Sequence, residues 1–97
     1  MRGGWTYIMT NHVRGVTYVG VTSSLVHRVA QHRAGEGSDF CRKYGLKRLV
    51  LAEPHDSIEA AIQREKQLKT WKRAWKIELV EQENPEWRDL WEDVLDS

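Results

Sequence analysis

Two short segments near the start of the chain are rich in β-branched and aromatic residues, the composition of strands. They are WTYIM (5–9) and VTYVGV (16–21), and the intervening NHVRG contains the turn-forming residues Asn11 and Gly15. The pattern predicts a β-hairpin with a loop of about six residues. Because side chains alternate between the faces of a strand, a symmetric hairpin would place Tyr7 roughly opposite Tyr18.

A helix and a third strand are predicted in the middle of the chain. The helix covers about 25–34, with a Thr or Ser cap at 22–24 and Ala34-Gly35 at its end. The stretch GEGSDFC that follows is typical of a loop. The sequence KRLVLAE (47–53) predicts a strand, and Pro54 is expected to stop it.

The last forty residues are predicted to be helical. One helix covers about 58–70 after a cap at Asp56 or Ser57, and 71–83 continues as helix after a bend near Thr70. Asn84-Pro85-Glu86 has the residues of a helix start, with Asn as N-cap and Pro in the first turn. The terminal helix then carries an apolar stripe on an acidic background, made of Trp87, Leu90, Trp91, Val94 and Leu95.

The order ββαβααα predicts an α/β (α+β) fold, a small three-stranded, mainly antiparallel sheet flanked by helices. A chain of 97 residues without an evident linker or repeat fits one domain over 1–97. Its core is expected at about 5–84, followed by an acidic amphipathic helix at 85–97. We expect the apolar stripe of that helix to close the domain's own core; docking on a protein partner or a homodimer is the alternative.

Polar residues occupy helix faces where apolar ones are expected. At 100° per residue, Arg28 and His32 share the face that Leu25 and Val29 use for packing. In the helix at 58–70, the same construction places Glu65 in the middle of the apolar arc. An unpaired carboxylate there would cost several kcal/mol or become protonated, so it needs a cation. Arg28, another basic side chain or a metal ion could supply it.

These polar residues resemble the motifs of the GIY-YIG nuclease superfamily. Its first motif corresponds to Trp5-Thr6-Tyr7, which keeps only the tyrosine, and its second to Tyr18-Val19-Gly20, a close match. The remaining matches are Arg28, about ten residues after the second tyrosine, His32 four positions later, Glu65 in REKQLK, and Asn84 near the end of the domain. The resemblance covers roughly residues 5–84 and is strongest to small single-domain members of bacterial type.

The resemblance implies metal-dependent endonuclease activity that hydrolyses phosphodiester bonds, with DNA favoured over RNA as substrate and DNA repair as one setting. It implies catalytic roles for Tyr7, Tyr18, Arg28, His32 and Asn84. Glu65 would hold one Mg²⁺ or Mn²⁺ ion, and a single carboxylate suits Mg²⁺ because that ion keeps much of its hydration shell. For Asn84, a helix cap is an equally good interpretation.

The group that deprotonates water stays open between two candidates. Tyr7 is the first choice, although a phenol with a pKa near 10 is only about one part in a thousand ionised at pH 7. His32 is the alternative, since its ordinary pKa lies near neutrality and the tyrosines would then only orient the water.

Charge is distributed unevenly along the chain, although the formal net charge is only +1. Residues 1–76 carry 14 Lys and Arg against 6 Asp and Glu, whereas 77–97 carry 1 against 8. The basic part predicts nucleic-acid binding through backbone phosphates. The candidate contacts are Arg33, Arg42, Lys43, Lys47, Arg48, Lys66, Lys69, Lys72 and Arg73, with Lys76 on the same helix. The alternative is that the basic part simply packs against the acidic end.

Trp71 and Trp75 are expected to pack in the core, with base stacking as the less favoured role. Cys41 is the single cysteine, so no internal disulfide can form and a reducing compartment is favoured. No segment has the length of a membrane span or the apolar region of a signal peptide, and a cytoplasmic protein is expected. The His and Cys spacing does not match a zinc finger. A non-catalytic nucleic-acid-binding protein of the same fold is the main alternative function.

Overall fold

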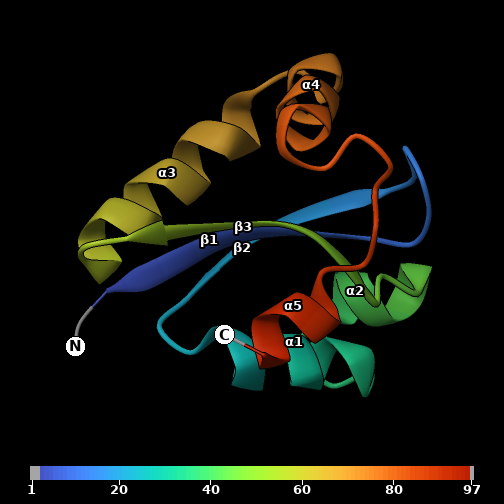
Figure 1. The fold of residues 1–97 in the computed structure, drawn as a ribbon, viewed down its shortest axis with the longest axis horizontal. Helices are drawn as coiled ribbons and strands as arrows, with labels where there is room; N and C mark the ends of the chain where they lie inside the picture. The colour runs from blue at the N-terminus through green and yellow to red at the C-terminus, as the bar shows by residue number, and fades with distance from the viewer. Residues whose placement is uncertain (1–2, 97) are drawn as a thin grey trace.

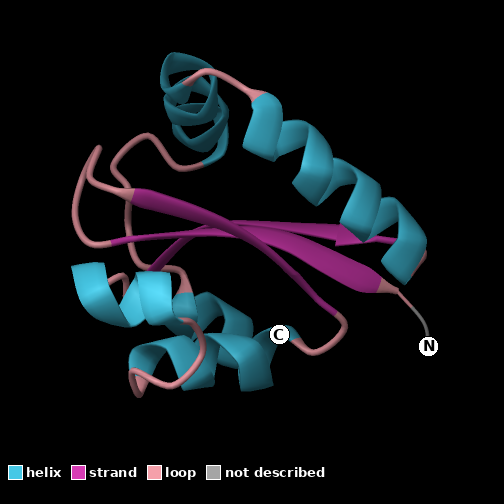
Figure 2. Ribbon diagram, turned by 180° about the vertical axis from the view of Figure 1, so that it is seen from behind, coloured by secondary structure: helices cyan, strands magenta, loops and turns pink. Residues whose placement is uncertain are grey.

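A three-stranded antiparallel sheet lies between two layers of helices in the computed structural model, which describes residues 3–96 (Figures 1 and 2). The strand order is β2-β1-β3, so β1 is central and both other strands are edges. The strands are β1 (Gly4–Thr10), β2 (Thr17–Thr22) and β3 (Arg48–His55). The helices are α1 (Leu25–Arg33), α2 (Asp39–Tyr44), α3 (Ile58–Thr70), α4 (Arg73–Glu83) and α5 (Trp91–Leu95). The predicted fold class is confirmed, with one additional short helix.

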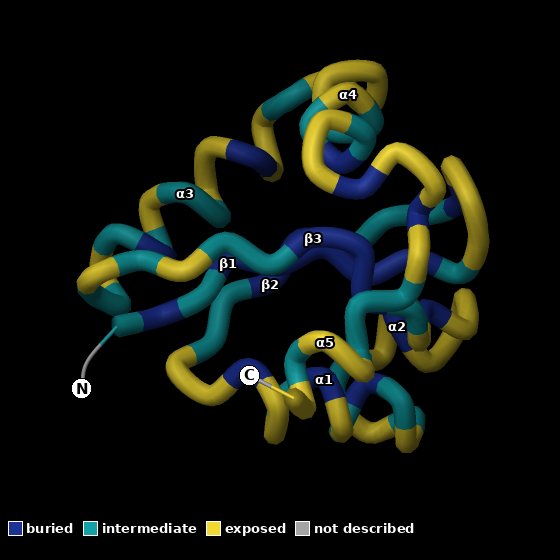
Figure 3. The backbone as a smooth tube through the Cα atoms, viewed as in Figure 1, coloured by how far each residue is buried: buried dark blue, intermediate teal, exposed yellow. Residues whose placement is uncertain are grey.

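Each face of the sheet has its own apolar core. The middle of β1 and of β3 is buried (Figure 3). In Figure 1, α3 and α4 cover one face, and α1, α2 and α5 cover the other. On the central strand, Tyr7 and Met9 point into the core beneath α1, while Ile8 joins the core beneath α3 and α4. The alternation of side chains along β1 therefore assigns Tyr7 to the same layer as α1.

The hairpin forms as predicted, but its register differs from the symmetric one. Tyr7 lies opposite Gly20, and Tyr18 lies opposite Met9, so the two tyrosines are diagonal rather than directly paired. The turn explains the shift: the Asn11 side chain accepts a hydrogen bond from the backbone N–H of Val16, which closes a loop over residues 11–16. The sequence alone did not reveal this Asn-closed turn.

The predicted loop GEGSDFC is partly wrong, because it contains the start of α2. The Ser38 hydroxyl accepts a hydrogen bond from the backbone N–H of Cys41, and Gly45 ends the helix in the left-handed conformation with φ of 65°. Cys41 and Leu46 are buried against the core. Tertiary burial of these two residues therefore stabilises a helix of only six residues, which is too short to be stable alone.

Pro54 does not stop the third strand, contrary to the prediction. β3 continues to His55, and Pro54 pairs with Trp5 of the central strand. Because β3 is an edge strand, a residue without a backbone N–H can lie there without breaking a ladder on a second side.

The segment after α4 also departs from the prediction of a helix starting at Asn84. Asn84 is the C-cap of α4, and α5 begins only at Trp91. Trp87, with φ of 57°, turns the chain and is fully buried in the core beneath α4. The expected apolar stripe is therefore divided between the two cores, with Trp87 in one and Leu90, Trp91 and Val94 in the other, on the α1 side. The segment thus helps to close the domain's own core.

None of the helices described over residues 3–96 has both the length and the apolarity needed to cross a bilayer.

Candidate active site

Tyr7 and His32 form a buried pair at the centre of the α1 layer. The Tyr7 hydroxyl lies 2.8 Å from His32 Nε2, and the rings are 5.6 Å apart between centroids. Both side chains are essentially inaccessible to solvent. The helix periodicity therefore placed His32 correctly on the packing face of α1, together with Leu25 and Val29.

Two glycines make room for this pair. A Cβ on Gly20 would lie 2.4 Å from Tyr7 Cζ and 2.5 Å from its hydroxyl oxygen, so the Tyr7 ring lies directly over the glycine. A Cβ on Gly37 would lie 2.7 Å from His32 Nδ1. A side chain at position 20 would collide with the Tyr7 ring, which explains why Tyr18-Val19 is followed by a glycine. Gly37 was missed by the sequence reasoning, because a glycine in a presumed loop gives no specific signal.

Tyr18 lies beside this pair on the edge strand β2. Its ring centroid is 6.4 Å from that of Tyr7 and 5.5 Å from that of His32. On its outer side are the Phe40 ring, at 6.2 Å, and the ammonium of Lys69, at 6.0 Å from the ring centroid. Because β2 is an edge strand, side chains from both helix layers reach Tyr18 around the edge of the sheet.

The surroundings keep the Tyr7 phenol neutral. Burial raises the pKa of Tyr7 to about 12, against the opposing effect of the nearby Arg28 guanidinium. At pH 7 the phenolate would therefore lie about 7 kcal/mol above the phenol. A preformed phenolate is not a resting state of this site.

His32 is also neutral at physiological pH. Burial lowers the pKa of His32 to about 4, and the positive charge of Arg28 acts in the same direction. Nδ1 of His32 is buried and has no hydrogen-bond partner among the described residues. Neutral His32 can accept the Tyr7 proton at Nε2, with its own proton on Nδ1.

Arg28 lies at the border between this buried pair and solvent. It is half-buried, its Nη1 donates a hydrogen bond to Gln31 Oε1 at 3.0 Å, and its contact with the Tyr7 hydroxyl raises the pKa of Arg28. Within residues 3–96 it forms no ion pair with Glu65, so that possible pairing is not the one observed. A guanidinium has five N–H donors, so these contacts leave Arg28 with donors for a further ligand.

The Glu65 side chain is largely shielded from solvent, as its position in the apolar arc predicted. The positive charge next to it comes from a basic side chain. The Glu65 side chain is only 13% exposed, and its Oε2 lies 2.6 Å from Lys69 Nζ one turn later on α3. Lys69 also approaches the Tyr18 ring, which places the Glu65 carboxylate on the Tyr18 side of α3.

The donor set at Glu65 fits a hydrated hard cation. No group of three or more His, Cys, Asp or Glu that could hold a metal was found within residues 3–96. A lone carboxylate is poor for zinc, but it is a normal protein ligand for Mg²⁺, which retains several waters. Lys69 is 51% exposed, so its side chain has room to move away from the carboxylate.

Asn84 is not part of the cluster around Tyr7. Its Nδ2 donates to the backbone carbonyls of Val50 and Arg88, at 3.2 and 2.8 Å, and its Oδ1 accepts the Arg88 N–H at 3.0 Å. The side chain thus connects the end of α4 to β3 and to the following turn. Its hydrogen-bonding capacity is used for structure.

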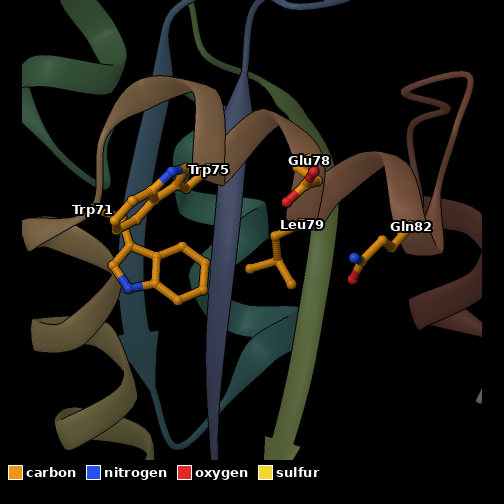
Figure 4. A pocket seen from close by; sticks show the side chains of 5 residues that line it. All are labelled: Trp71, Trp75, Glu78, Leu79 and Gln82. Atoms are coloured by element: carbon orange, nitrogen blue, oxygen red, sulfur yellow. The ribbon is translucent and has the colours of Figure 1, made fainter.

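Trp71 and Trp75 differ in their surroundings. Trp71 packs against the core beneath α4 as expected, but Trp75 is 51% exposed, so the expectation of core packing is wrong for Trp75. Their rings meet edge to face at 6.0 Å between centroids and line a surface pocket with Leu79 (Figure 4). Glu78 and Gln82 complete this pocket.

Several of the predicted basic contacts are used inside the protein. Arg33 pairs with Asp89 at 2.8 Å, Arg48 donates to the Trp87 carbonyl, and Arg73 donates to the carbonyls of Gly15 and Arg14. The pairing of Arg33 with Asp89 shows that basic and acidic parts of the chain do pack together. The lysines for which no ion pair was found within residues 3–96 are Lys43, Lys47, Lys66, Lys72 and Lys76.

The fold described above is a small α+β domain with a polar cluster beneath α1. The family model of the GIY-YIG catalytic domain matches residues 3–78. The chain therefore belongs to the GIY-YIG family, a nuclease fold.

Relatives share most of this chain. A UPF0213 protein of Natronomonas pharaonis is 44% identical over 66 residues, which is 68% of this chain and 78% of the relative. A UPF0213 protein of Haloquadratum walsbyi is 37% identical over 67% of this chain and 73% of its own length. One of Aeromonas salmonicida is 32% identical over 90% of this chain and 63% of its own length. No solved structure matches the chain significantly.

Proposed function

We propose that this protein is a metal-dependent endonuclease that hydrolyses phosphodiester bonds of nucleic acid, with DNA as the preferred substrate. The observation that carries the proposal is the buried hydrogen bond between Tyr7 and His32 with the Arg28 guanidinium beside it. A stability-driven design would fill this position with apolar side chains, because buried polar pairs contribute little net stability. The same three groups supply a proton acceptor and a phosphate ligand.

In the proposed reaction, Tyr7 positions the attacking water and passes its proton to His32. Because the phenolate is costly, the Tyr7 hydroxyl accepts the water proton only as it donates its own to Nε2 of neutral His32. Oxygen of the resulting hydroxide forms a bond to phosphorus while the bond to the leaving oxygen breaks. Arg28 donates hydrogen bonds to the phosphoryl oxygens, whose negative charge increases in the transition state.

Glu65 is the proposed ligand of one Mg²⁺ or Mn²⁺ ion, which when bound neutralises negative charge on the phosphate and the leaving oxygen. Lys69 pairs with this carboxylate at 2.6 Å and would have to leave it for the ion to bind. Tyr18 forms the wall between Tyr7 and Lys69 and orients the water. Asn84 is left out of this mechanism, because backbone groups occupy its side chain. The buried thiol of Cys41 is compatible with a reducing compartment such as the cytoplasm.

The test is cleavage of supercoiled, branched and single-stranded DNA in Mg²⁺ or Mn²⁺. Arg28→Ala, Tyr7→Phe and Glu65→Gln are each expected to lower the rate at least a hundredfold, the scale of losing one charge-stabilising or acid-base group. Lys69→Ala is the matched control for Glu65→Gln, since it removes the same ion pair but keeps the carboxylate. It should reduce the Mg²⁺ concentration needed for half-maximal rate.

A non-catalytic nucleic-acid binder is the second candidate, and the Lys69–Glu65 ion pair favours it, because that pair satisfies the carboxylate without a metal. Under this alternative the wild type cleaves none of the substrates with either ion. Binding would then be equal for the wild type and Glu65→Gln.

A further inference from the structure

Aromatic side chains continue outward from the candidate active site to the protein surface. Tyr18, Phe40 and Tyr44, here called the aromatic strip, follow one another from β2 onto α2. The Tyr18 and Phe40 rings are 6.2 Å apart and inclined by only 30°, and the Phe40 and Tyr44 rings are 4.9 Å apart. The inner end of the strip touches His32, so the strip leads directly away from the reacting groups.

The outer half of the strip is exposed. Phe40 is 42% and Tyr44 is 43% accessible to solvent. The helix that carries Phe40 and Tyr44 is anchored by Cys41, which is buried in the core. A large part of the Phe40 and Tyr44 rings is therefore left uncovered by the domain, and adjoining exposed rings of this kind are typical of binding surfaces.

Positive charge surrounds the strip. Tyr18 and Phe40 line a shallow pocket of about 330 Å³, and the charged side chains among its lining residues are Lys69 and Lys76. The Lys43 ammonium lies 5.3 Å from the centre of the Tyr44 ring. Two acidic groups adjoin the strip's own residues and their lysine, and both are paired within the protein: Glu65 with Lys69, and Asp39, which precedes Phe40, with Arg42.

We propose that the aromatic strip stacks against an unpaired nucleobase next to the scissile phosphate, so that the substrate is a strand with single-stranded nucleotides at the cleavage position. This inference rests on the proposed nuclease function and specifies its substrate. Lys69 and Lys76 contact the phosphates that flank the stacked base. Stacking on aromatic rings combined with a basic surface is the general arrangement for binding single strands without sequence preference.

A continuous duplex fits this surface poorly. In a duplex both faces of each base are covered by its neighbours, so a base can offer a face to Phe40 only at an end, a flap, a fork or an extruded position. A cationic peptide is disfavoured by the three lysines. An anionic partner with flat aromatic groups matches both the rings and the charge, and a polynucleotide strand has both.

The test measures binding without cleavage, in EDTA, by fluorescence anisotropy. The probes are a labelled 12-nucleotide single strand containing 2-aminopurine and a blunt duplex of the same length. Wild type should bind the single strand more tightly and change its 2-aminopurine fluorescence. Phe40→Ala should weaken single-strand binding about tenfold, corresponding to loss of stacking with one base, and leave duplex binding unchanged.

Two further variants separate aromatic stacking from general apolar contact and from loss of folding. Phe40→Leu keeps an apolar side chain without an aromatic face and should resemble Phe40→Ala. Leu95→Ala removes a similarly exposed apolar side chain from α5 and should bind like wild type. Circular dichroism should show all three variants folded.

The outcomes also distinguish this inference from the proposed function. Equal single-strand affinity of wild type and Phe40→Ala, or an equal loss for duplex and single strand, overturns the stacking proposal even if the protein cleaves DNA. A selective loss of single-strand binding supports it even if no substrate is cleaved, in which case only the nuclease function fails.

Discussion

At the scale of single residues, the site depends on how closely two side chains are packed. The Tyr7 ring lies on the backbone of Gly20, and this contact fixes the hydroxyl 2.8 Å from His32. Burial then sets the chemistry: it raises the pKa of Tyr7 and lowers the pKa of His32, so both are neutral and a proton can move between them. Packing on Gly20 therefore sets the position of the Tyr7 hydroxyl, and burial sets the protonation states of Tyr7 and His32.

Gly20→Ala should disrupt this contact. Because the added Cβ would lie 2.4 Å from Tyr7 Cζ, the ring must move, and we expect a loss of about 1–3 kcal/mol in the free energy of unfolding together with the loss of cleavage. Urea denaturation measures the first and the nicking assay the second. Gly45→Asn is the control, since no atom lies within 4 Å of a Cβ there and Asn tolerates the left-handed conformation. Wild-type stability of Gly20→Ala would contradict the packing described.

His32 should make stability depend on pH. Its pKa is about 4 in the folded protein and about 6.5 unfolded, so between these values only the unfolded chain binds the proton. The free energy of unfolding should therefore fall as pH is lowered from 6.5 to 4, by about 3 kcal/mol in total from this group, and be insensitive to it above 6.5. Urea titrations at pH 7 and 4.5 should show this loss in wild type and in His27→Gln, and a much smaller one in His32→Gln. If His32→Gln loses as much stability between pH 7 and pH 4.5 as wild type, a group other than His32 is responsible for the pH dependence.

At the scale of helices and strands, periodicity predicted more than local residue signals did. The 3.6-residue repeat correctly placed His32 in the core and Glu65 in a shielded position, because both depend on which helix face meets the sheet. The sequence could not show which cation lies next to Glu65, because any nearby basic side chain can pair with a carboxylate. Signals such as Pro54 and Asn84-Pro85 were misread because their effect depends on context: an edge strand for the first and a C-cap for the second.

Asn84→Ala should affect stability and not chemistry. The substitution leaves the Val50 and Arg88 carbonyls and the Arg88 N–H without their partner, and we expect a loss of about 1–3 kcal/mol. The rate of cleavage per folded molecule should match wild type when measured well below the unfolding midpoint. Asn84→Asp keeps the acceptor for the Arg88 N–H but sets a buried carboxylate oxygen against the two carbonyls, so it should be destabilised at least as much. A stable Asn84→Ala protein with no activity would place Asn84 in the active site after all.

At the scale of the whole molecule, the C-terminal segment holds the two layers together. Trp87 fills the core beneath α4, whereas Leu90 and Trp91 fill the core on the α1 side. Asp89, between them, accepts hydrogen bonds from the Leu49 N–H and from Arg33. An amphipathic stripe was predictable from the sequence, but its division between two cores was not, because it depends on the turn at Trp87.

Removing residues 85–97 should therefore unfold the domain. Trp87→Ala alone is expected to cost about 3–5 kcal/mol, the usual range for a fully buried tryptophan. Near-UV circular dichroism and the dispersion of amide proton signals in NMR measure the loss of packing. A chain ending at Leu95 is the control and should remain folded. If the protein lacking 85–97 is a folded monomer, the segment is an interface for a partner.

The central claim is that Glu65 holds a divalent ion on the Tyr18 side of α3, and crystals grown with Mn²⁺ test it most directly. The account predicts one anomalous scattering peak at the Glu65 carboxylate, within about 2.2 Å of an oxygen, with Lys69 displaced from it. A Lys69–Glu65 ion pair that persists in protein shown to cleave DNA in Mn²⁺, with the ion bound elsewhere, would contradict it.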